Sequence, residues 1–144
     1  MKTTILILNA FFDFIIVLAS LPLVRTVMIH SPLFDASAPQ WQPKRYLYSG
    51  IYAAIVYFLL AASGGFYSIK RQPAKSKVPA TNFSYFLFLF LLGLFACWRY
   101  AGYYDGAPFV SKRALLFALT ISYFITTFFH YFTSLFISRP LKTT

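Results

Sequence analysis

Four long apolar stretches, residues 5–24, 46–69, 82–101 and 114–138, are separated by short polar connections. Each stretch has about the 20 residues that an α-helix needs to cross a hydrocarbon core roughly 30 Å thick. In lipid, the backbone polar groups must be satisfied within the spanning structure, which a helix achieves by itself. The pattern therefore predicts an all-α integral membrane protein built as a four-helix transmembrane bundle.

The connections between these stretches contain prolines and basic residues and are short. None is long enough to hold a folded soluble domain. We therefore expect residues 1–144 to form a single transmembrane domain. The first stretch also resembles a secretory signal peptide, with Lys2 before an apolar run, but Asp13 interrupts that run. We expect it to be retained as the first span.

Composition supports this class and excludes others. Hydrophobic residues make up 59% of the chain and charged residues only 11%, an excess of apolar side chains that a soluble domain of this size could not bury. The net charge of +10 does not indicate nucleic-acid binding, because the basic residues flank apolar stretches and form no helical face or arm. The expected partners are the lipid bilayer and other integral membrane proteins or further copies of this chain, with no nucleic acid and no cofactor.

The distribution of basic residues predicts an orientation. Seven of the 13 lysines and arginines lie on the side that would hold both termini and the middle connection, including Lys70, Arg71, Lys75 and Lys77. The positive-inside rule then places both termini in the cytoplasm. We expect the bacterial cytoplasmic membrane, with the endoplasmic reticulum as the alternative.

Asp13 is the most informative residue, because a carboxylate deep in a transmembrane helix costs several kcal/mol unless it is paired, protonated or in contact with water. It lies about 12 Å along the first span at 1.5 Å per residue. His130 lies at the same distance from the corresponding end of the fourth span, which runs in the opposite direction. The two residues are therefore predicted to lie at the same depth.

Further polar residues extend this match into a predicted intramembrane polar seam. On the first span Asn9, Asp13 and Ser20 share a face, and on the fourth so do residues spaced three or four apart. One antiparallel register sets Asn9 level with Ser134, Asp13 with His130, and Ser20 with Tyr123. The whole predicted seam is Asn9, Asp13, Ser20, Tyr123, Thr127, His130 and Ser134.

Two interpretations of the seam stay open at this stage. It can be an interhelical set of hydrogen bonds that holds two spans together, each worth about 0.6 to 2 kcal/mol. It can also be a site where Asp13 and His130 share a proton that is coupled to transport or ligand binding. Asp13 could instead meet a basic group of another subunit.

Small residues predict where helices approach closely. Gly50, Ala54, Ala61 and Gly65 recur along the second stretch and Gly93 lies on the third, and such residues let transmembrane helices pack backbone to backbone. Cys97 is the one cysteine of the chain, so an internal disulfide and a multi-cysteine metal site are excluded.

At the far end of the third stretch, Arg99, Tyr103 and Tyr104 form a possible contact for a lipid headgroup or an anion. The simpler interpretation is an arginine that extends to the interface among aromatic residues.

The sequence contains no catalytic set: glutamate is absent, there is no histidine-rich cluster and no phosphate-binding glycine loop. We therefore expect a non-catalytic membrane subunit or scaffold that packs against partner membrane proteins. The alternative is a small proton-coupled transporter or ligand-binding membrane protein that uses Asp13.

Overall fold

The computed structural model describes residues 1–30, 43–101 and 110–138. This part of the chain is helical, with α1 at Lys2–Ile29, α2 at Pro43–Ser63, α3 at Val78–Ala101 and α4 at Lys112–Ser138. All four helices are long and apolar enough to span a membrane. The predicted number of helices is therefore confirmed.

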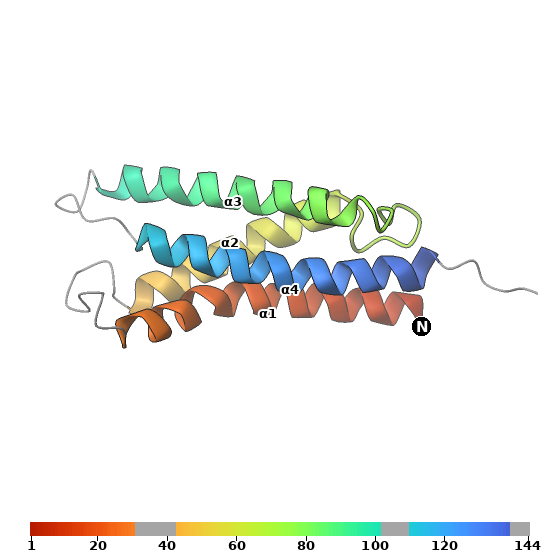
Figure 1. The fold of residues 1–144 in the computed structure, drawn as a ribbon, viewed down its shortest axis with the longest axis horizontal. Coiled ribbons are helices and arrows are strands. Elements are labelled where there is room, and N and C mark those ends of the chain that lie inside the picture. The colour runs from red at the N-terminus through yellow and green to blue at the C-terminus, as the bar shows by residue number, and fades with distance from the viewer. Residues whose placement is uncertain (31–42, 102–109, 139–144) are drawn as a thin grey trace, which may run out of the picture.

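The helices form an antiparallel bundle in which successive helices run in opposite directions (Figure 1). α1 packs along both α2 and α4, and α3 packs mainly on α4, whereas α2 and α3 contact each other less. The start of α1, the end of α4 and the connecting segment 64–77 lie together at one end of the bundle. We call this the terminal end.

All four helices begin two to four residues before the predicted bounds, and α1 and α2 also end away from them. α1 continues through Pro22 to Ile29, although the prediction ended it at residue 24. α2 ends at Ser63, six residues before the predicted end of the second stretch. The uncharged run was continued too far because apolar character alone does not mark a helix end.

The early end of α2 has a local cause at Gly65, which was predicted to be a helix-packing residue. Gly65 has a φ of +87°, a conformation that glycine adopts without steric cost. Its N–H donates to the Ala62 carbonyl at 3.2 Å and the Phe66 N–H donates to the Ala61 carbonyl at 3.0 Å. These two bonds form a Schellman motif that ends the helix, so Gly65 is a terminating residue and the packing assignment was wrong.

The other small residues lie where helices touch. A Cβ added to Gly50 would lie 2.4 Å from the backbone oxygen of Leu18 on α1, and one added to Gly93 would lie 2.6 Å from a methyl group of Leu115 on α4. Ala54 and Ala61 are both fully buried. The small residues Gly50, Ala54 and Ala61 of α2 therefore allow α1 to approach closely, as such residues do in membrane helices.

Large apolar side chains cover the outside of the bundle as well as its core. Buried residues such as Val17, Leu21 and Tyr57 pack between the helices. Phe11, Phe124 and many others are exposed on the outer faces. Such a surface is unfavourable in water and suits a hydrocarbon environment.

An added methyl group should change the stability of the bundle differently at Gly50 and at Gly93. Gly50→Ala should lower the free energy of unfolding by about 1–3 kcal/mol, because the new Cβ meets rigid backbone and the helices must move apart. Gly93→Ala is the matched control: it gains the same helix propensity, but it meets a leucine methyl that can rotate away. Thermal unfolding in detergent measures both, and an equal or larger loss for Gly93→Ala would contradict the close approach at Gly50.

Candidate functional site

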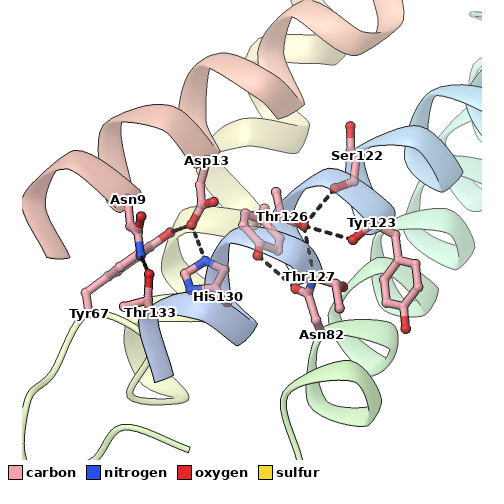
Figure 2. A network of polar contacts seen from close by, with 11 residues as sticks. Asn9, Asp13, Tyr67, Asn82, Ser122, Tyr123, Thr126, Thr127, His130 and Thr133 are labelled. Carbon is pink, nitrogen blue, oxygen red and sulfur yellow. Dashed lines mark hydrogen bonds and ion pairs between the residues drawn. The ribbon is translucent and has the colours of Figure 1, made fainter. Parts of the chain in front are cut away.

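Asp13 lies at the centre of a buried polar network in the terminal half of the bundle (Figure 2). Its side chain is 1% exposed, and its Oδ2 atom lies 2.6 Å from Nε2 of His130, which is completely buried. The same oxygen accepts a hydrogen bond of 2.5 Å from the hydroxyl of Tyr67. The predicted contact between Asp13 and His130 is thus present in the structure.

Helix geometry brings these groups together. Asn9, Asp13 and Val17 follow one another at four-residue steps along the buried face of α1, and residues at this spacing share one face of a helix. On α4, Thr126, His130 and Ser134 do the same. Because the two helices are antiparallel neighbours, the two buried faces meet along their length.

The connecting segment 64–77 supplies the third partner and closes the network at the terminal end. After the turn at Gly65, Phe66 is fully buried, with its ring centroid 4.4 Å from that of His130. Farther along the segment, the Pro73 carbonyl accepts a hydrogen bond of 2.6 Å from Ser134. The segment therefore packs against the helices of the bundle.

The hydrogen bond between Tyr67 and Asp13 runs from the phenol to the carboxylate. Tyr67 lies outside the four helices. The pKa of its phenol is raised well above the usual range, mainly by burial and secondly by the adjacent Asp13 carboxylate. Burial disfavours the charged phenolate. The phenol therefore stays protonated and donates to Asp13.

A second group of polar contacts lies next to the first and joins α2, α3 and α4. Asn82 on α3 accepts a hydrogen bond of 2.8 Å from the Tyr57 hydroxyl on α2. Its amide nitrogen donates to Thr126 at 2.9 Å and to Thr127 at 2.8 Å on α4. Because Asn82 and Tyr57 are both fully buried, this amide is a junction between three helices.

Two of the three predicted pairings, Asn9 with Ser134 and Ser20 with Tyr123, do not form. Asn9 donates to Thr133 in place of Ser134. Ser20 is buried but donates to the Val17 carbonyl of its own helix at 2.8 Å, and Tyr123 donates to the Pro79 carbonyl on α3 at 3.1 Å. The register at Asp13 is correct, whereas the face predicted for α4 is rotated toward α3.

That rotation explains which residues the sequence analysis missed. A step of four residues back from His130 reaches Thr126 and then Ser122, both fully buried, whereas the predicted set followed Thr127 and Tyr123, which are half-buried. The periodicity would have found Thr126. Tyr57, Tyr67 and Asn82 could not be found in this way. The periodicity within one element does not show which other element it packs against.

The arrangement at Asp13 allows two placements of the proton. The imidazole N–H can donate to the carboxylate, or the carboxylic acid can donate to a neutral imidazole. Oδ1 of Asp13 and Nδ1 of His130 are buried and make no hydrogen bond within the described residues. The distance of 2.6 Å between Oδ2 and Nε2 allows either placement.

Other candidate chemistry is limited. Within the described residues no group of three or more histidine, cysteine, aspartate or glutamate side chains could hold a metal ion. Cys97 is buried and its thiol donates to the Val110 carbonyl at 3.6 Å. Arg99 is exposed in the last turn of α3, while Tyr103 and Tyr104 lie outside the described residues, so the predicted lipid or anion contact stays a prediction.

The hydrogen bond from Tyr67 to Asp13 should contribute measurably to stability. Tyr67→Phe removes one of the two groups bonded to Oδ2 and should lower the free energy of unfolding by about 0.6–2 kcal/mol. Thermal unfolding in detergent measures this loss, and Tyr52→Phe is the matched control, because Tyr52 is 69% exposed on the outer face of α2.

A double-mutant cycle then isolates the interaction itself. Asp13→Ala, Tyr67→Phe and the double variant give the coupling energy between the two side chains, because alanine has no side-chain oxygen that could accept from the phenol. Additive losses would mean that the Tyr67 hydroxyl does not interact with Asp13, contrary to the observed geometry.

Comparison with known proteins gives no relative from which a role could be transferred. Among protein-family models, curated proteins and solved structures, none matches this chain. The site must therefore be interpreted from its own geometry and chemistry.

Proposed function

We propose that this protein is an integral membrane subunit or scaffold without catalytic activity. In this proposal α1 to α4 cross the bilayer, both termini and the connecting segment 64–77 face the cytoplasm, and the outer helix faces pack against partner membrane proteins or further copies of the chain.

The observation that carries the proposal is the enclosure of the polar network. Asp13 and His130 are 1% and 0% exposed, and their partners come from the same chain. Three grooves are lined by described residues, two of them almost wholly apolar, and neither Asp13 nor His130 lines any of the three. A substrate site in a membrane protein needs polar groups that reach a cavity, whereas an enclosed network serves to fix how helices pack.

The outer surface offers faces for partners. A row of large side chains, all between 45% and 65% exposed, follows the outer face of α4 at helical spacing and consists of Phe117, Ile121, Phe124, Phe128 and Phe132. Aromatic side chains contribute large contact areas at interfaces. This row is the surface that we expect a partner helix to contact.

The proposed orientation can be tested by labelling single cysteines. In a Cys97→Ser background, a cysteine replacing Lys75, which is exposed in the connecting segment, should react in intact cells only with a reagent that permeates the membrane. A cysteine replacing Lys44 at the start of α2 should react with an impermeant reagent as well. The reverse pattern would invert the topology, and equal reaction of both positions with the impermeant reagent would contradict membrane insertion.

Purification of the tagged chain in mild detergent should recover a companion in fixed stoichiometry. Phe124→Ala combined with Phe128→Ala should reduce recovery of that companion severalfold, since these residues are central to the α4 row and truncation of large buried anchors weakens interfaces. Phe88→Ala combined with Phe95→Ala, two exposed positions on α3, is the matched control. Equal recovery with both double variants would exclude the α4 row as the partner surface.

A proton-coupled transporter is the second candidate, and the unpaired Oδ1 of Asp13 and Nδ1 of His130 favour it. In a proton-coupled transporter, these two atoms would bind the proton or the substrate when the interior opens to water. Asp13→Asn in reconstituted vesicles distinguishes the two functions. A lone, correctly folded chain whose pH-dependent transport is abolished by this change would contradict the scaffold proposal, whereas reduced thermal stability without any transport to lose would support it.

A further inference from the structure

A groove between α1 and α2 at the terminal end is lined by both polar and apolar residues. Its volume is about 390 Å³. Thr3, Ser68 and Lys70 line it at the start of α1 and on the connecting segment, while Ala10 and Phe58 line it farther from the terminal end along α1 and α2. Seven residues separate Thr3 from Ala10, which is about 10 Å along the helix at 1.5 Å per residue. The groove therefore changes from polar to apolar over a distance comparable to a lipid headgroup and the first part of its chain.

The connecting segment beside the groove is positively charged. Lys70, Lys75 and Lys77 are exposed on the connecting segment, and this segment contains no aspartate or glutamate that would neutralise them. Arg71 has a different role, because its guanidinium donates to the carbonyls of Ala62 and Ser63 at the end of α2, each at 3.4 Å. Lys70 is thus the cation that lines the groove itself.

We propose that this groove binds an anionic phospholipid from the leaflet at the terminal end. One acyl chain lies between α1 and α2 near Ala10 and Phe58, and the phosphate lies against the Lys70 ammonium and the hydroxyls of Thr3 and Ser68. A groove of this volume is too small for a partner helix, whose diameter with side chains is about 10 Å. The proposal rests on the proposed membrane insertion, since only an embedded chain presents the groove to lipid.

The groove shares one wall with the buried polar network. Tyr67 lines it, and the hydroxyl of the same residue donates to Asp13. A chain packed in the groove therefore contacts the side chain that closes the network. Lipid binding should accordingly raise the unfolding temperature of the bundle, because a ligand that binds only the folded state stabilises it.

Native mass spectrometry of the full-length chain in detergent tests the headgroup preference. The probes are phosphatidylglycerol and phosphatidylcholine with identical acyl chains. We expect phosphatidylglycerol to bind more tightly, and Lys70→Gln to weaken its binding about fivefold, the effect of about 1 kcal/mol for one basic residue near anionic lipid. Lys75→Gln is the matched control, because it removes the same charge from the same segment but does not line the groove.

A second variant tests the apolar part independently of charge. Ala10→Leu fills the groove and should weaken binding of both lipids, whereas Ala19→Leu, at an exposed position on α1, should leave binding unchanged. Circular dichroism verifies that each variant remains helical. Inorganic phosphate at the same concentration should not displace the lipid, because it lacks the chain.

Several results would overturn the site. These are equal binding of the two lipids, equal effects of Lys70→Gln and Lys75→Gln, or displacement by inorganic phosphate. Failure of the proposed insertion is distinguished separately, since the cysteine labelling described above and cell fractionation report it without any lipid-binding measurement.

Discussion

The carboxylate of Asp13 is the constraint on which the terminal half of the bundle depends. Placed deep in an apolar helix, it is costly unless groups of the same protein compensate it. His130 and Tyr67 both reach its Oδ2 atom. Satisfying this one oxygen fixes how α1 lies against α4 and draws the connecting segment back into the bundle. The turn at Gly65 makes this return possible, because it ends α2 early enough for Phe66 and Tyr67 to point inward.

The other contacts between helices depend on a second polar junction, at Asn82, and on small residues. Asn82 joins three helices through its amide, including α2 and α3, whose contact with each other is smaller than that of α2 with α1 or of α3 with α4. Between α1 and α2, Gly50 lets the backbones come together, where dispersion contacts replace polar ones. Polar side chains thus join α1 to α4 and α2 to α3, and small residues allow the close approach of α1 and α2.

These features connect the proposed functions through one residue. The Tyr67 hydroxyl donates to Asp13 in the polar network, and Tyr67 also lines the α1–α2 groove. An enclosed network suits a scaffold whose outer surface meets partners, and a groove at its edge would let the surrounding lipid add to its stability. The same Asp13–His130 pair would serve a transporter only if the connecting segment moved, since Phe66 lies against the His130 ring.

The sequence by itself determined the helical class, the number of long apolar helices and the depth match between Asp13 and His130, because hydrophobic length and helical periodicity are local properties. It did not determine the end of α2, since the turn at Gly64 and Gly65 interrupts a run that stays uncharged. It also missed Tyr67 and Asn82, and it rotated the face of α4 toward Tyr123 and Thr127. Only the tertiary structure decided these points, because which polar groups meet depends on the rotation of each helix about its axis and on the return path of the connecting segment. Both are set by packing between elements distant in sequence.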